Sequence, residues 1–393
     1  MISLMSKSVK DCIFLTFLTL LVTALVWLPH LLALPGFWGL SFKEGLSTIY
    51  KNFDGLEYVV IAKTFYNPLA ISALPQSLPA NYFAAHFPGY ALLIAIFAPI
   101  LGYLKSMLFV SMASTVLAGL VFYFLVKDFK LSNHPLFLSF IFLILPARWL
   151  IVHSVGSSEP TFILFILSAV YFFMRFEQSG KPINIFLAGM LGLFAQITRP
   201  PGILLFIALF LYLLYKFFFH NKLTGFKNVL FNSLKYTPLT LIPLGLLGIF
   251  YLYSQTYGDF WAYFKSGDNI HLTLPPFQVF NKEQFWVGDI WLEDIIYIFI
   301  LGFLGGVMLI KQKLYPLAFL VLTYLAASSL IAHRDISRYV LPVSPFILIA
   351  FEKVLTSKEF RIILPIILLA IYLYAQNFLI ANVAPIPRLE LFN

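Results

Sequence analysis

Long apolar runs separated by short polar connections make up most of the chain. A helix that crosses a bilayer needs about 17–25 predominantly apolar residues. The sequence therefore predicts an all-α polytopic membrane protein with eleven membrane-spanning helices and further juxtamembrane helices in its first outer loop. The predicted spans cover residues 12–34, 107–127, 134–150, 159–175, 182–198, 200–219, 236–257, 291–310, 314–332, 339–352 and 361–380.

A further apolar run, 88–104, decides the topology, because every later span changes direction if it crosses. We expect this run to lie along the outer face or dip into it, with the N-terminus in the cytoplasm. The Lys-rich segment 216–235 then faces inward, as the positive-inside rule favours. The cytoplasmic connections in this arrangement carry 15 of the 26 Lys and Arg residues: Lys7, Lys10, Lys127, Lys130, Arg175, Lys181, Lys216, Lys222, Lys227, Lys235, Lys311, Lys313, Lys353, Lys358 and Arg361.

The composition agrees with a bilayer environment. Hydrophobic residues make up 61% of the chain and charged residues 11%, whereas soluble domains carry about 25% charged residues. The formal net charge of +9 comes from short clusters between apolar runs. This distribution is typical of cytoplasmic loops and argues against a nucleic-acid partner. The single cysteine, Cys12, excludes an intramolecular disulfide and a cysteine-based metal cluster.

The chain shows no internal repeat and no separate soluble domain, so we expect one membrane domain over residues 1–393. The first apolar run, 12–34, is too long for a signal-peptide core, which predicts an uncleaved first span. The expected location is the cell membrane in a prokaryote or the endoplasmic reticulum membrane in a eukaryote.

This topology gathers the unusual polar residues on the outer side. The first outer loop 35–106, the second outer loop 258–290 and the Arg-bearing loop 333–338 all lie there, together with the loop 151–158 and the turn at Arg199. Polar groups must converge to form an active site. We therefore expect an extracytoplasmic active site built from these segments.

The first outer loop carries the strongest catalytic candidate. Asp54 precedes Gly55 and a predicted short helix, 56–66, with Glu57 and Tyr58 in its first turn. A carboxylate at this position either caps the helix or acts in catalysis. His86, further along the loop, either donates a hydrogen bond to a substrate or to Asp54, or is an interfacial histidine with no role.

Three other segments contribute charged candidates. Glu159 opens a span, where a carboxylate is costly unless it is hydrogen-bonded or faces a wet cavity, although Ser157 and Ser158 also offer plain helix capping. Three arginines on the outer face oppose the inside bias of basic residues, so we expect them to bind anionic lipid headgroups or a phosphate or diphosphate. These residues and their neighbouring tyrosine are Arg199, Arg334, Arg338 and Tyr339.

No cofactor or metal is expected. The outer carboxylates show no metal-ligand spacing, and no D-x-D pair occurs in the chain. Gly-rich phosphate loops and G-x-S-x-G elbows are absent as well.

A set of short motifs resembles the PIG-V-type mannosyltransferases of the GT-C superfamily of membrane glycosyltransferases. The segment 53–62 reads Phe-Asp-Gly-Leu-Glu-Tyr-Val-Val-Ile-Ala and resembles that family's W-D-x-x-W/Y-Y-x-x-I-A. Phe53, Leu56 and Gly89 depart from the family pattern, which leaves the acceptor and the subfamily open. The remaining motifs follow in the family order: 86–90 resembles F-F-P-x-Y, 158–162 resembles S-E-x-x-F, 198–202 resembles T-R-P-x-G, and 257–260 and 338–342 also fit.

The resemblance implies a GT-C-like fold and an inverting transfer of a sugar. The donor is a polyprenyl- or dolichyl-phosphate sugar, with a hexose such as mannose, and the acceptor is a hydroxyl of a glycan, glycolipid or protein. The resemblance implies that Asp54 is the general base. We expect the substrate to be bound by Glu57, Tyr58, His86, Glu159, Arg199, Arg334, Arg338 and Tyr339.

Three other functions remain open from the sequence. A transporter or lipid flippase usually shows paired repeats and polar residues at the membrane midplane, and neither is visible here. An oligosaccharyl or aminoarabinose transferase is a second alternative. A non-catalytic subunit that keeps the fold is a third, although the presence of Asp54 weighs against it.

Overall fold

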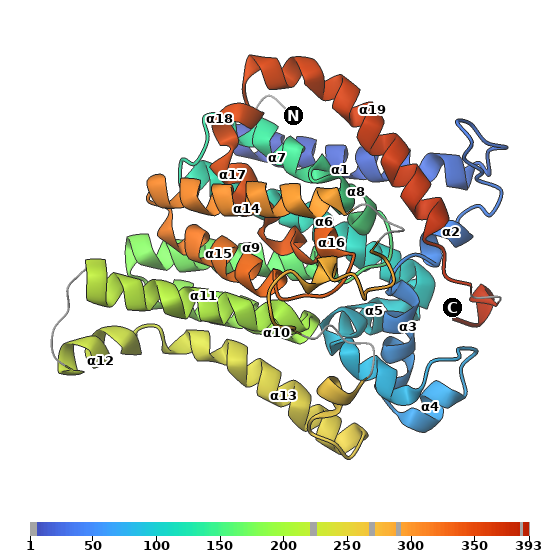
Figure 1. Ribbon diagram of the computed structural model, residues 1–393, viewed down its shortest axis with the longest axis horizontal. Helices are drawn as coiled ribbons and strands as arrows, with labels where there is room; N and C mark the ends of the chain where they lie inside the picture. Colours follow the sequence, from blue (N-terminus) through green and yellow to red (C-terminus); the bar gives the residue numbers. More distant parts are fainter. Residues whose placement is uncertain (1–5, 221–225, 267–271, 288–291, 386–387, 393) are drawn as a thin grey trace.

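The computed structural model describes residues 6–220, 226–266, 272–287, 292–385 and 388–392, and the described residues form helices without a β-strand. Lys222 and parts of the predicted outer loop 258–290 lie outside these residues. Figure 1 shows the longer helices running side by side through the molecule. Their bounds are α1 (Lys7–Leu31), α6 (Tyr103–Asp128), α9 (Glu159–Ser179), α10 (Pro182–Thr198), α11 (Ile203–Leu214), α13 (Leu241–Thr256), α14 (Glu293–Lys311), α15 (Tyr315–Ser328) and α19 (Lys358–Ala381).

Shorter helices lie between and beside the long ones. They are α2 (Ser47–Tyr50), α3 (Gly55–Thr64), α4 (Pro68–Ser72), α5 (Pro88–Leu101), α7 (Pro135–Ile144), α8 (Ala147–His153), α12 (Phe226–Leu234), α16 (Ile336–Tyr339), α17 (Ser344–Ala350) and α18 (Glu352–Leu355).

The predicted all-α membrane architecture is confirmed. Among the described residues, seven helices are long and apolar enough to cross a bilayer, and α7 with α8 forms an eighth if this pair, bent by 75°, is one span. Three shorter apolar helices, Pro182–Thr198, Tyr315–Ser328 and Ile336–Ala350, fall on the remaining predicted spans. Each of the eleven predicted spans thus has a helical counterpart. The number of membrane crossings itself stays a prediction.

The run 88–104, on which the predicted topology depends, forms α5 and the start of α6. Helix α5 has 14 residues, and at 1.5 Å per residue it reaches about 21 Å, short of a hydrocarbon core of about 30 Å. Gly102, with φ +76°, joins it directly to α6. Helix α5 packs against α3, α6 and α10.

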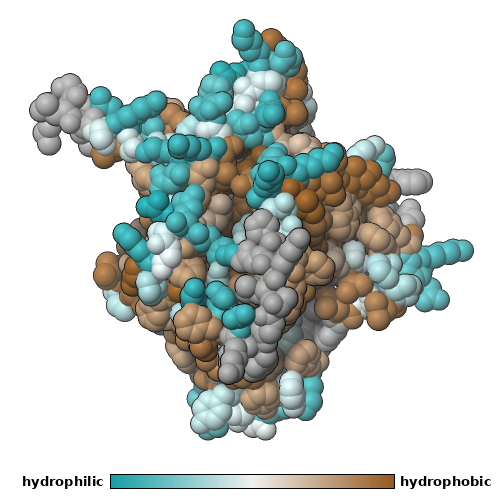
Figure 2. Space-filling model, turned by 90° about the vertical axis from the view of Figure 1, so that its left-hand side faces the viewer, coloured by the Kyte–Doolittle hydropathy of each residue, from teal (hydrophilic) through white to brown (hydrophobic). Residues whose placement is uncertain are grey.

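The connections between helices gather at two opposite ends of the molecule. Helices α12 and α18 lie at the left-hand end in Figure 1, and α2, α3 and α4 lie at the right-hand end. Figure 2 looks onto the left-hand end and shows many hydrophilic residues there, with hydrophobic surface along the flanks. The basic segment around α12 and the first outer loop are therefore at opposite ends, as the predicted topology requires.

Close backbone contacts hold the first outer loop against the helices that follow. A Cβ added at Gly55 would meet the carbonyl oxygen of Gly156 at 2.6 Å, and one at Gly89 would meet the Cα of Thr198 at 2.8 Å. Only glycine allows these approaches. They place the starts of α3 and α5 beside the start of α9 and the end of α10.

Candidate active site

Four charged side chains from four separate segments form one connected network at the end of the molecule that carries α3. Arg338 donates from Nη2 to Asp54 Oδ2 at 2.6 Å and from Nε to Glu159 Oε1 at 2.5 Å. Arg199 pairs with the same Glu159 oxygen at 2.5 Å and donates to Ser158 Oγ at 2.9 Å. We call Asp54, Glu159, Arg199 and Arg338 the charge network.

Local structure explains how each member reaches this point. Asp54 immediately precedes α3, and Glu159 is the first residue of α9. Arg199 directly follows α10, where Pro200 and Pro201 end the helix by blocking its backbone hydrogen bonds. Arg338 lies in the short helix α16. Three of the four charged residues thus lie at helix ends, and Arg338 is the exception. A position at a helix end keeps a charge near the end of an apolar segment.

The network is buried around Glu159 and open at Asp54. The Glu159 side chain is 1% exposed and that of Arg338 is 7% exposed, whereas Asp54 keeps 35% of its side-chain surface accessible. Two guanidinium groups balance the two carboxylates, so the network as a whole is neutral. Buried charges are tolerated when they are paired in this way. The accessible carboxylate of Asp54 is the part that a substrate is able to reach.

The helix-capping alternative for Asp54 is not realised, because its side chain makes no hydrogen bond to the first turn of α3. Burial acts to raise the pKa of Asp54, but Arg338, with His86 and Arg199, outweighs it and holds that pKa well below its usual range. Asp54 is therefore ionised at neutral pH. Arg338 also lies over the Phe53 ring, 4.5 Å from its centroid.

Glu57, predicted to bind substrate, lies one turn after Asp54 and behaves differently. Burial, reinforced by the charge of Asp54, raises the pKa of Glu57 to about 8. Its Oε2 is buried and has no hydrogen-bond partner among the described residues. Glu57 is therefore mostly a neutral acid at pH 7, able to donate a hydrogen bond next to an ionised carboxylate.

Tyr58 and His86 lie beside the charge network, and their predicted role in substrate binding stays a prediction. Tyr58 is buried, hydrogen-bonds to Ser158 and interacts with Arg199. Burial raises the pKa of Tyr58 to about 12, so it stays a hydroxyl donor. The Tyr58 and His86 rings meet edge to face at 5.3 Å, and His86 interacts electrostatically with Asp54.

The two remaining predicted residues, Tyr339 and Arg334, lie in different surroundings from each other. Tyr339 interacts electrostatically with Arg338 and Asp54, and its ring contacts His333 at 5.4 Å. Arg334 is exposed and lies 5.9 Å from the centroid of the Phe285 ring. Arg334 forms no part of the charge network. Arg199 and Arg338 both pair with Glu159 and are largely buried, whereas Arg334 is exposed.

Sequence analysis missed one functional candidate, Arg148 on α8. Its Nη2 pairs with Asp335 at 2.8 Å, its Nε donates to Ser337 at 3.2 Å, and its guanidinium lies 4.1 Å from the centroid of the Phe378 ring. The pair fixes the segment that carries Arg338. A signal was present in the sequence, because an arginine inside an apolar run is costly unless it is paired.

Metal ligation has no visible basis in the described ranges, which contain no group of three or more His, Cys, Asp or Glu residues placed to hold an ion. An accessible ionised carboxylate beside buried guanidinium groups is able to accept a proton and to stabilise a phosphate.

Neither a family model nor a curated protein sequence matches the chain. Solved structures do resemble it. The oligosaccharyltransferase of Archaeoglobus fulgidus in its apo form has a TM-score of 0.51 and 13% sequence identity, with 94% of this chain and 56% of that chain covered. The same archaeal oligosaccharyltransferase, AglB, in complex with an inhibitory peptide and a dolichol-phosphate has a TM-score of 0.50, with the same identity and coverage.

The chain spans little more than half the length of these archaeal proteins. At 13% identity the likeness concerns the fold. The oligosaccharyltransferase is a GT-C-type enzyme, so the GT-C-like fold expected from the sequence is confirmed. The chain has an all-helical fold similar to that part of the archaeal oligosaccharyltransferase which it covers.

Proposed function

We propose that the protein is a glycosyltransferase that moves a sugar from a polyprenyl- or dolichyl-phosphate donor to an acceptor hydroxyl with inversion, at the extracytoplasmic face of a membrane. The sugar is a hexose such as mannose, as the PIG-V-type motifs suggest. The observation that carries the proposal is the accessible Asp54 carboxylate, ion-paired to Arg338 in a charge network, on a GT-C-type fold.

The chemistry needs one base and a good leaving group. Asp54 takes the proton of the acceptor hydroxyl, whose oxygen forms the new bond to the anomeric carbon. The bond from that carbon to the phosphate oxygen breaks, and the lipid phosphate leaves with the electron pair. Attack from the face opposite the phosphate inverts the configuration. A phosphate leaves without protonation by a second acid.

The guanidinium groups have a matching role. Arg338 and Arg199 supply fixed positive charge where charge grows on the leaving phosphate. A phosphate bound to Arg338 competes with Asp54 for the same guanidinium. The ion pair that lowers the pKa of Asp54 is then weaker, so donor binding makes Asp54 a better base at the moment it is needed.

Two observations favour this class over a transporter. The charge network lies at the start of α3 and α9 and the end of α10 rather than at mid-length of these helices, whereas transporters bind substrate near the membrane midplane. The archaeal protein with a similar fold was determined with a dolichol-phosphate, which supports a lipid phosphate as the class of donor.

The test is the replacement Asp54→Asn, with Asp128→Asn as the matched control. Asp128 accepts a hydrogen bond from Tyr171 at 2.7 Å and lies outside the charge network. Mass spectrometry of lipid-linked and surface glycans, in cells lacking the gene and in cells carrying each variant, measures transfer. We expect Asp54→Asn to lower transfer at least ~100-fold, the scale of a lost general base. Near-normal transfer by this variant at normal protein level removes the base assignment.

A further inference from the structure

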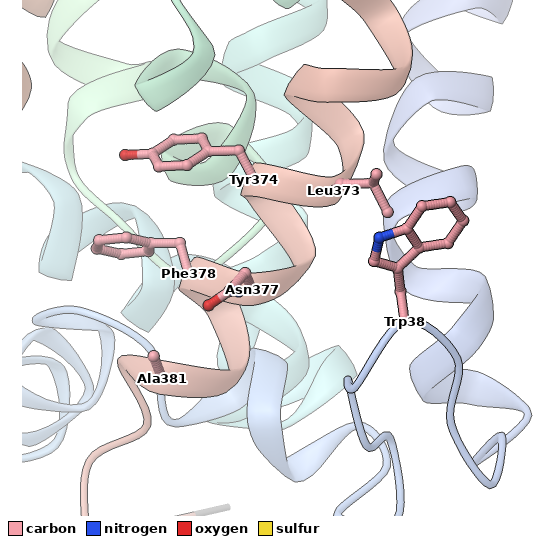
Figure 3. Close-up of a pocket in the computed structure, with 6 residues that line it drawn as sticks. All are labelled: Trp38, Leu373, Tyr374, Asn377, Phe378 and Ala381. Atoms are coloured by element: carbon pink, nitrogen blue, oxygen red, sulfur yellow. The ribbon is translucent and has the colours of Figure 1, made fainter.

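A groove of about 340 Å³ lies over the last turns of α19, at the end of the molecule that carries the charge network. Figure 3 shows Trp38 on one side of α19, with Tyr374 and Phe378 extending toward the other. We call this the α19 groove, and its lining residues are Trp38, Leu373, Tyr374, Asn377, Phe378 and Ala381.

The α19 groove opens toward the region where lipid would lie. Within the apolar part of α19, 28% of the residues are buried inside the protein, so most of its surface is available to acyl chains. Trp38 is 80% exposed. Exposed tryptophans gather at the membrane interface, which places the groove at the depth where a lipid tail meets its headgroup.

Phe378 links this groove to the charge network. Its ring stacks on Phe53 with a centroid distance of 5.5 Å and an interplanar angle of 21°. Arg338 lies over the other ring of this pair, 4.5 Å from the Phe53 centroid. A side-chain hydrogen bond holds the connection in place, because the Asn52 amide donates from Nδ2 to Leu379 O of α19 at 2.9 Å. Only the stacked rings of Phe378 and Phe53 therefore separate an apolar ligand that contacts Phe378 from the Arg338 guanidinium.

A second guanidinium group flanks the same aromatic pair. Arg148 lies 4.1 Å from the Phe378 centroid and interacts electrostatically with Tyr374, another groove residue. Its Nε and Nη2 are occupied by Ser337 and Asp335. Its Nη1 is buried and has no hydrogen-bond partner in the part of the chain that the structure describes. A guanidinium group with an unused donor thus lies against Phe378, just beyond the groove lining.

We propose that the α19 groove binds the first part of the isoprenoid tail of a polyprenyl phosphate, with the phosphate on the inner side of Phe378, near Arg148 and Arg338. This inference rests on the proposed function and adds the location of the lipid carrier. An apolar groove bordered by an aromatic pair that carries a guanidinium group on each of its two rings fits an amphiphile with a long apolar tail and an anionic head. Its volume lies near the lower end of the ~300–1,000 Å³ of small-molecule sites, enough for part of a long chain.

A second groove provides a matched control. It has a volume of about 480 Å³ and lies between α14 and the segment before it. Its lining residues are Phe277, Phe280, Ile296, Phe299, Ile300 and Phe303. Neither lining carries a charge, but Arg148 lies over Phe378 of the α19 groove, and among the described residues no Lys or Arg lies over a ring of the second groove. Because it offers no partner for a phosphate, we expect it to contact lipid without selecting a polyprenyl phosphate.

The experiment is photo-crosslinking of the purified full-length protein in nanodiscs with a polyprenyl phosphate that carries a diazirine on its second isoprene unit. We expect labelled peptides from α19 and from the segment around Trp38. Asn377→Trp fills the α19 groove and lowers this labelling at least 10-fold, whereas Ile300→Trp, in the second groove, leaves it unchanged. Both positions are exposed, so neither variant disturbs helix packing.

Competition separates a carrier site from general lipid contact. An excess of unlabelled polyprenyl phosphate should prevent crosslinking of the diazirine lipid, whereas the same amount of phosphatidylglycerol should not. Equal displacement by both lipids, or unchanged labelling of Asn377→Trp, overturns the inference. Labelling needs no sugar transfer, so its failure is distinct from failure of the proposed function. A protein that is labelled selectively but transfers no sugar keeps the lipid site and loses the transferase proposal.

Discussion

Replacing Arg338 by Gln tests whether the charge network organises this end of the molecule. The change removes the hydrogen-bonded ion pairs to Glu159 and Asp54 and the cation over Phe53. Removing one partner of a buried ion pair typically costs about 3–5 kcal/mol, because a buried charge is left without compensation. Two features reduce the cost here. Glu159 keeps its pair with Arg199, and Asp54 is 35% exposed and regains water.

We therefore expect Arg338→Gln to lower the free energy of unfolding by about 3 kcal/mol, the low end of that range. The assay is equilibrium denaturation of purified protein in detergent, followed by circular dichroism and tryptophan fluorescence. Arg334→Gln is the matched control. Arg334 is exposed and outside the charge network, and exposed substitutions usually change stability by less than about 0.5 kcal/mol.

A double-mutant cycle isolates the contact from other effects of the substitution. Glu159→Gln is combined with Arg338→Gln, and the coupling free energy is compared with the ~0.5–3 kcal/mol found for residues in one ion-pair network. The reasoning is refuted if the two single changes add to within about 0.3 kcal/mol, or if Arg338→Gln is as mild as Arg334→Gln. Either result means that the buried ion pairs do not hold these segments together.

Two further predictions concern the same region. Because the folded-state pKa of Glu57 is about 8 against an ordinary value of 4.5, its neutral form adds stability below pH 4.5 that is lost as pH rises through 8. The unfolding free energy of Glu57→Gln should therefore decrease less between pH 4.5 and pH 8 than that of the unchanged protein. If both proteins show the same decrease with pH, the pKa of Glu57 is not raised. Gly55→Ala should cost about 1–3 kcal/mol because its Cβ meets the Gly156 carbonyl oxygen. Gly248→Ala, with open space around its Cβ, is the control, and equal melting temperatures for the two variants contradict this packing argument.

The apolar pattern alone predicted the architecture correctly, because lipid as a solvent imposes a local rule on every span. Each of the eleven predicted spans has a helical counterpart. The pattern was less informative at 134–150, where the chain bends by 75° between α7 and α8. This bend carries Arg148 to Asp335, a partner 187 residues away, and no local feature of the sequence announces that pairing.

The order of apolar and polar residues was thus enough to predict a helical membrane protein. It also indicated Asp54, Glu159, Arg199 and Arg338 as separate candidates, because a charge beside an apolar run is costly unless it is paired or hydrated. Tertiary structure decided that these charges meet. Arg338 reaches Asp54 and Glu159 across 284 and 179 positions of the chain, and it leaves Arg334, four positions earlier, exposed. The physical reason is that hydropathy acts along each segment separately, whereas an ion pair forms within about 4 Å and depends on how the helices pack.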